Sequence, residues 1–181
     1  MPRMPSLQIT AICIGDDPGV GKDPVRTAEI GAHGLNGDRH ATQTVRIRAG
    51  KRRGETIFNE RQWSAVSEEE IREIEKALGV AIPVGALGEN FRVEGQSALS
   101  QLPFGTRIRL PNGPVLLVSG QNFPCQKQSD YLAGLFEIPT LRRAFMPASK
   151  DLRGIVGWVE TTGPVTVGDR AVVELPETVA T

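Results

Sequence analysis

The sequence predicts a mainly β protein with a few helices, and three observations lead to this fold class. The chain has 181 residues, which suits one domain with a sizeable core. It contains 20 glycines and 13 prolines, a density typical of short strands joined by turns rather than of a helical bundle. Apolar and polar residues alternate in several short runs, without an internal repeat or a long linker. We therefore expect a single domain over residues 1–181, with a core from about residue 9 to residue 175.

The composition restricts the classes of function. Hydrophobic residues make up 39% and charged residues 23%, as in ordinary globular proteins. The 21 acidic and 21 basic residues cancel, so no bulk charge favours nucleic acid or a membrane surface as a partner. No run approaches the ~18 apolar residues of a membrane span, and the N-terminus lacks the apolar core of a secretion signal. The two cysteines form no CxxC pair and indicate no disulfide framework. We expect a cytoplasmic protein.

The strongest helix signal lies within residues 63–78. Ser67 and Glu70 have the spacing of a capping box, and Gly79 is a natural C-terminal stop. Two shorter helices are expected at residues 129–136 and 140–145. The glutamates of the first helix are expected to form a solvated face rather than paired catalytic carboxylates: Glu68, Glu69, Glu70, Glu73 and Glu75.

Strands are expected wherever short apolar runs lie between turn residues. The first is residues 7–14, in which Cys13 is interpreted as structural. A hairpin, residues 105–110 and 115–118 joined by a Pro-Asn-Gly-Pro turn, leads towards Cys125. The remaining expected strands are residues 24–30, 91–93, 155–159 and 170–175.

Cys125 is the main candidate for chemistry. It follows the buried strand of residues 115–118 in a turn, and Pro124 stiffens the segment that carries it. Lys127, two residues on, is a cation that would favour a thiolate over a thiol. The alternative for this stretch alone is a buried, inert cysteine.

A second candidate region runs from Arg39 to Arg53 and holds six basic side chains without an acid. It is either a solvated loop face or an anion pocket, since guanidinium groups bind phosphate in a fork geometry. The Gly-rich segment of residues 31–40, which overlaps the start of this region, carries His33 and His40. Their spacing matches no metal motif, so we do not expect them to ligate a metal. The basic residues are Arg39, Arg46, Arg48, Lys51, Arg52 and Arg53.

Four motifs in order resemble the MOSC domain family, named for the C-terminal domain of molybdenum-cofactor sulfurases. They are Gly-Leu-Asn-Gly-Asp-Arg-His at residues 34–40, Gly-Glu-Asn-Phe at 88–91, Pro-Cys at 124–125 and Gly-Pro-Val-Thr-Val-Gly-Asp at 163–169. The resemblance covers residues 9–175 and implies a β-barrel of MOSC type. It also implies a bound molybdenum cofactor (molybdopterin type), with the family cysteine as a molybdenum or sulfur ligand.

The resemblance assigns Cys125 as the catalytic residue and metal ligand. It also places Gly37, Asp38, Glu89 and Asn90 in family motifs. Asn122 stands where many relatives carry an arginine, three residues before the cysteine. The expected cofactor-binding residues are Gly37, Asp38, Arg39, His40, Arg46, Arg48, Glu89, Asn90, Asn122 and Arg153.

Three functions remain open from the sequence. The first, which the resemblance implies, is a molybdenum-dependent oxidoreductase that reduces N-hydroxylated small molecules. It would need a separate electron-donor reductase, because the chain has no flavin or iron–sulfur motif. The second is a sulfur or molybdenum-cofactor carrier that uses a Cys125 persulfide. The third is a thiol hydrolase with Cys125 as nucleophile and His33 or His40 as base.

Overall fold

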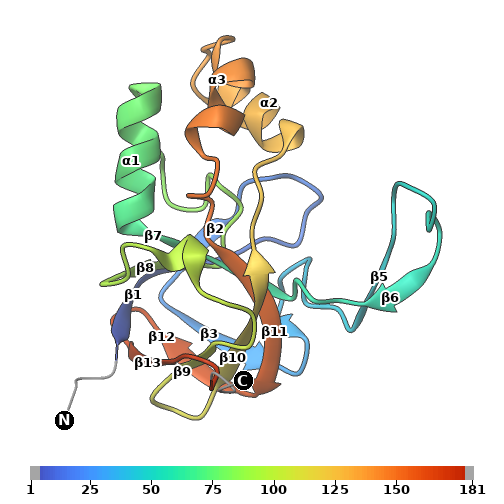
Figure 1. Ribbon diagram of the computed structural model, residues 1–181, viewed down its shortest axis with the longest axis vertical. Helices are drawn as coiled ribbons and strands as arrows, with labels where there is room; N and C mark the ends of the chain where they lie inside the picture. The colour runs from blue at the N-terminus through green and yellow to red at the C-terminus, as the bar shows by residue number, and fades with distance from the viewer. Residues whose placement is uncertain (1–4, 178–181) are drawn as a thin grey trace.

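A closed β-barrel of seven strands forms the body of the molecule, described by a computed structural model over residues 5–177 (Figure 1). Neighbouring strands are antiparallel except for the parallel pair β7–β8. The barrel closes because β1 also pairs with β13, which confirms the expected fold class. In barrel order the strands are β13 (Arg170–Glu174), β9 (Arg107–Arg109), β10 (Val115–Gln121), β11 (Ile155–Thr161), β7 (Trp63–Ser67), β8 (Phe91–Glu94) and β1 (Ser6–Ile14).

The remaining strands lie outside this ring. β2 (Asp23–Val25) extends the sheet by pairing with the end of β1. A three-stranded sheet joins β12, β3 and β4, so the single strand expected over residues 24–30 is in fact divided between two sheets. β5 and β6 form a hairpin that projects from the barrel (Figure 1). Their bounds are β3 (Thr27–Gly31), β4 (Gly34–Leu35), β5 (Thr44–Arg46), β6 (Thr56–Phe58) and β12 (Gly163–Thr166).

The helices α1 (Glu68–Leu78), α2 (Gln126–Leu135) and α3 (Leu141–Ala148) gather at one end of the barrel (Figure 1). A 3₁₀ turn, η1 (Leu99–Gln101), lies between β8 and β9. None of the helices in residues 5–177 is long and apolar enough to cross a membrane.

The ends of α1 follow the sequence signals. The Ser67 hydroxyl accepts a hydrogen bond from Glu70 N at 3.1 Å, and Gly79 ends the helix with φ of 70°. The expectation of a solvated glutamate face is wrong for Glu70. Its buried carboxylate accepts hydrogen bonds from N and Oγ of Ser100, at 2.8 and 2.9 Å.

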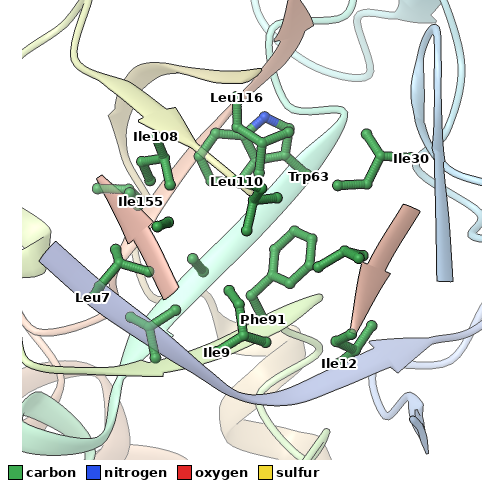
Figure 2. Packing of buried hydrophobic residues seen from close by; sticks show 14 of the residues in the cluster. Leu7, Ile9, Ile12, Ile30, Trp63, Phe91, Ile108, Leu110, Leu116 and Ile155 are labelled. Atoms are coloured by element: carbon green, nitrogen blue, oxygen red, sulfur yellow. The ribbon is translucent and has the colours of Figure 1, made fainter. Parts of the chain in front are cut away.

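Apolar side chains fill the barrel interior (Figure 2). Leu7, Ile9 and Ile12 point inward from β1, and the rings of Trp63 and Phe91 meet edge to face with centroids 6.5 Å apart. A second cluster lies beneath the helices and contains Val66, Ile71, Ile74, Ile82, Ala86, Leu87, Leu132 and Phe145. The two clusters support a rigid barrel end, from which the segments of the candidate site emerge.

Candidate functional site

A cleft of about 570 Å³ brings Cys125 together with several basic side chains. Its walls come from loop 16–20, residues 39–48, the start of β7, residues 87–90 and the start of α2. The expected site residues that line it are Arg39, His40, Arg48, Asn90, Asn122, Cys125 and Arg153. The expected residues outside its lining are Gly37, Asp38, Arg46 and Glu89.

Cys125 is exposed and occupies the N-cap position of α2. Its backbone is extended, and its carbonyl oxygen accepts hydrogen bonds from the amides of Gln128 and Ser129. The thiol makes no capping hydrogen bond, so the sulfur is available to a ligand or reactant. This placement contradicts the alternative that Cys125 is buried. The ammonium group of Lys127 lies on the same cleft and donates to the Pro18 carbonyl at 2.7 Å.

Arg153 supplies a buried cation in the wall of the cleft and is only 3% exposed. Its Nε donates to Gln128 Oε1 at 2.9 Å, and Nη2 donates to the Leu87 carbonyl. Nη1 is buried and has no partner within the described residues. Burial lowers the pKa of Arg153 to about 10, against the influence of Glu89 and Cys125, so the group stays charged at neutral pH. A buried, charged donor without a hydrogen-bond partner is suited to bind an anion.

Arg61 is a cleft residue that the sequence analysis missed. Its Nη2 donates to Asn122 Oδ1 at 2.7 Å, across 61 positions of sequence. Partial loss of water around the guanidinium lowers the pKa of Arg61, and Cys125 acts in the opposite direction. An arginine from a distant segment of the chain therefore lies beside Asn122. No local motif marks Arg61, and only the pairing of distant segments identifies it.

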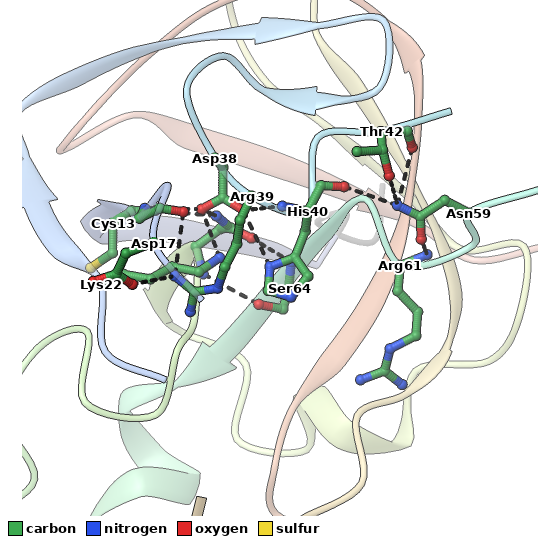
Figure 3. Close-up of polar contacts among 12 residues, drawn as sticks. Cys13, Asp17, Lys22, Asp38, Arg39, His40, Thr42, Asn59, Arg61 and Ser64 are labelled. Carbon is green, nitrogen blue, oxygen red and sulfur yellow. Dashed lines mark hydrogen bonds and ion pairs between the residues drawn. The ribbon is translucent and has the colours of Figure 1, made fainter. Parts of the chain in front are cut away.

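Asp38 lies outside the lining of the cleft and binds residues that form its wall (Figure 3). Its carboxylate accepts hydrogen bonds from the amides of Gly15 and His40 and from Asn90 Nδ2, and lies 2.8 Å from Lys22 Nζ. Burial alone would raise the pKa of Asp38. The hydrogen bond from His40 and the charge of Lys22 outweigh it and hold the pKa well below its usual range.

The Gly-Glu-Asn motif also builds the wall. Asn90 Nδ2 donates to the Cys13 carbonyl as well as to Asp38, and its Oδ1 accepts from the Ser64 amide. Glu89 is fully buried and accepts from the Gly85 amide and from Arg92 Nε at 2.8 and 2.7 Å. Cys13 is buried, and this burial, followed by the charge of Glu89, raises its pKa to about 12. Its interpretation as a structural residue is consistent with this environment.

The basic stretch predicted as one anion pocket is divided in the structure. Arg39 and Arg48 line the cleft, whereas Arg46 donates to the Gly54 carbonyl within the projecting hairpin. Arg39 also donates to the carbonyls of Gly15, Val20 and Gly21, and so anchors the loop of residues 15–21.

Of the two histidines, only His40 lines the cleft. Its Nδ1 lies 3.3 Å from Asp38 Oδ1, and half of its side chain is exposed. Within residues 5–177, no group of three or more His, Cys, Asp or Glu side chains could hold a metal ion together.

Comparisons with known proteins agree with this architecture. The YuaD protein of Bacillus subtilis (strain 168), named as a candidate metal-sulfur cluster biosynthesis protein, is 40% identical over 143 residues, 75% of this chain and 73% of its own length. The crystal structure of YuaD from Bacillus subtilis superposes with a TM-score of 0.90 at 33% identity, covering 98% of this chain and all of the other. YiiM from Geobacillus stearothermophilus gives a TM-score of 0.63 at 21% identity, covering 92% of this chain and 74% of that one, and shows a shared fold. Residues 35–172 match the MOSC domain, and the chain therefore belongs to the MOSC domain family.

Proposed function

We propose that the cleft binds a molybdenum cofactor of the molybdopterin type and that the loaded protein reduces N-hydroxylated small molecules. One observation carries the proposal: the exposed Cys125 thiol shares a cleft with Arg153, a buried cation with an unused donor. A thiolate is a soft ligand for a transition metal, and a guanidinium is a geometric match for phosphate. Membership of the MOSC family supports a role connected with the molybdenum cofactor or with sulfur transfer.

The residues present fit such a group. Cys125 offers one protein ligand, which suits a metal whose other ligands come from an organic cofactor. Arg153 and Arg61, with Arg39 and Arg48 across the cleft, would hold the phosphate. When bound, the group supplies two-electron redox chemistry at molybdenum.

The chain itself would position the substrate and supply a proton. Reduction of an N–O bond consumes protons, and His40 is the imidazole at the cleft. The contact between its Nδ1 and Asp38 favours a proton on Nδ1 and leaves Nε2 for exchange with a substrate. Electrons would come from a separate donor protein.

A second candidate function is sulfur transfer through a Cys125 persulfide. The exposure of Cys125 favours it, as does the name of the related YuaD protein, which refers to metal-sulfur cluster biosynthesis. The Cys125 thiolate would attack the terminal sulfur of a donor persulfide. A new S–S bond would form at Cys125 while the donor left as a thiolate. The neighbouring Arg61 and Arg153 would stabilise the resulting anion.

Replacement of each cysteine tests the proposal. Cys125→Ser should abolish molybdenum retention and N-reductive turnover, because a hydroxyl is a hard and poorly ionised ligand. Its thermal melting should be unchanged, since the Cys125 side chain is exposed. Cys13→Ser is the control: it places a hydroxyl in the core and should cost stability while activity is retained.

Elemental analysis, turnover with a reductase partner and cyanolysis of sulfane sulfur separate the candidates. Molybdenum with N-reductive turnover supports the main proposal. Sulfane sulfur on Cys125 without reductive turnover selects the carrier. Metal-free protein that hydrolyses esters or peptides selects the thiol hydrolase, with His40 as base. Full activity of Cys125→Ser would contradict all three.

A further inference from the structure

The projecting hairpin carries charge that the cleft does not use. We define the basic arm as residues 44–58, which comprise β5, β6 and the turn between them. Its basic side chains are all exposed, and only Arg48 among them lines the cleft. Arg46, Lys51, Arg52 and Arg53 lie outside it, and Arg52 pairs with the arm's single acid, Glu55, at 2.8 Å.

Positive charge is concentrated in the arm, and the rest of the chain carries a net negative charge. Five of the 21 basic residues but only one of the 21 acidic residues lie in residues 44–58. The arm therefore has a formal charge of +4, and the remainder of the neutral chain has −4. A projecting arm of one sign on a body of the other creates a directed field that acts on approaching charged molecules.

The arm is fixed at its root and lies beside the reactive cysteine. Asn59 donates from Nδ2 to the carbonyls of His40 and Thr42, and Phe58 packs edge to face on Trp158 at 5.8 Å. Val45 and Arg48, near the root, line the same cleft as Cys125. The root of the arm and Cys125 therefore border the same cleft.

We infer that the basic arm is the docking surface for a protein partner with an acidic face, which exchanges electrons or sulfur with the Cys125 site. The inference rests on the proposed function, because Cys125 is the group that such a partner must reach. Complementary charge gives fast and oriented encounter without strong affinity, which suits a partner that must leave after each exchange.

The charge distribution favours an acidic protein over nucleic acid. A compact acidic patch contacts the arm alone, whereas a long polyanion extends over a body with a formal charge of −4. Nucleic-acid binding also draws its affinity from phosphate contacts along an extended basic surface. Here the excess of basic residues is confined to the arm.

Thiol–disulfide exchange at Cys125 tests the arm. The probe is a glutamate-rich peptide whose single cysteine carries a 2-thiopyridyl disulfide, compared with a serine-rich peptide of equal length. Release of pyridine-2-thione reports the attack of Cys125, since Cys13 is buried with a pKa raised to about 12. At low ionic strength the acidic peptide should react about tenfold faster or more, and high salt should remove the advantage.

Charge-reversal variants show whether the acidic peptide is attracted by the arm itself or by the net charge of the whole protein. Lys51→Glu with Arg53→Glu, both at the exposed tip, should remove most of the preference for the acidic peptide. The control is Arg72→Glu with Lys76→Glu, which makes the same change in net charge on the exposed face of α1, away from the arm (Figure 1). This control variant should keep the preference for the acidic peptide. Reaction with neutral 2,2′-dithiodipyridine should be the same in every variant, because the thiol itself is unchanged.

The outcomes are separable from the proposed function, since the assay needs no cofactor. Equal rates for the two peptides, or equal losses in both double variants, would overturn the inference. Binding of a DNA duplex that depends on Lys51 and Arg53, without preference for the acidic peptide, would assign the arm to nucleic acid instead. If the purified protein binds no molybdenum but still prefers the acidic peptide, the proposed function alone would be overturned.

Discussion

A single unused donor on Arg153 should set the strength of anion binding in the cleft. Arg153→Lys keeps a positive charge but loses the fork that binds Gln128, Leu87 and an anion together. One lost charge-assisted hydrogen bond corresponds to about 1.5–3 kcal/mol, or roughly a tenfold to hundredfold rise in the dissociation constant. Equilibrium dialysis of the pterin cofactor, with thermal melting as a check on folding, would measure it. Unchanged retention would show that Arg153 is structural.

Arg46 and Arg48 allow a controlled test of which arginines in the basic stretch bind the cofactor. They lie two residues apart, but only Arg48 lines the cleft. Arg48→Glu should therefore weaken cofactor retention by tenfold or more, whereas Arg46→Glu should leave it nearly unchanged. Pterin fluorescence of the purified variants provides the comparison. Equal effects would indicate that the field of the whole arm, rather than a contact, holds the anion.

The turn that carries Asp38 depends on a buried ion pair, and this makes its stability sensitive to pH. The folded pKa of Asp38 lies below its ordinary value of about 3.9. The stabilisation is therefore complete above that value and is lost as the pH falls towards the folded pKa. Urea unfolding between about pH 5 and pH 2 should show the loss, and Asp38→Asn should flatten it.

The same variant leaves Lys22 buried without its counter-ion. Burial already lowers the pKa of Lys22, against the attraction of Asp38. Asp38→Asn should cost about 3–5 kcal/mol near neutral pH. The loss should shrink in alkali, where Lys22 becomes neutral. The double variant Asp38→Asn with Lys22→Met removes the isolated charge and should recover part of the stability. No recovery would mean that the hydrogen bonds to Gly15 and His40 dominate.

At the scale of elements, local signals were sufficient for much of the fold. The caps of α1 at Ser67 and Gly79 and the hairpin β9–β10 depend on neighbouring residues, so the sequence predicts them. The break between β2 and β3 does not follow from their own residues, because each strand is fixed by a different partner.

The site was predictable only where a motif is contiguous. Cys125 and the Gly-Glu-Asn motif are short signals, and the structure brings Cys125 and Asn90 to one cleft. Arg61 meets Asn122 across 61 positions, and Glu70 meets Ser100 across 30, without a local pattern for either pair. The sequence predicts one basic surface over residues 39–53, because proximity in sequence does not show where a hairpin turns side chains away from the cleft.

For the whole molecule, an inward-facing position of the strand that closes the barrel should be far more sensitive to substitution than its outward-facing neighbour. In β13, Val173 is 1% exposed and faces the core, whereas Val172 is 37% exposed. Val173→Asp buries an unpaired charge and should abolish cooperative unfolding or cost several kcal/mol. Val172→Asp should change stability by about 0.5 kcal/mol or less. Urea unfolding followed by circular dichroism would compare them, and similar costs would contradict the inward orientation of Val173.

Because β1 pairs with β13, the cleft can form only late in the synthesis of the chain. Among the described residues, β1 is the first strand made and β13 the last, so the barrel remains open until nearly the whole chain has been translated. Contacts of such long sequence separation form slowly. The walls of the cleft come from segments between residues 16 and 156 that the barrel holds together. The loading of cofactor or sulfur proposed above would therefore require a finished barrel. A chain stalled before β13 would expose the Cys125 thiol without the surrounding cleft.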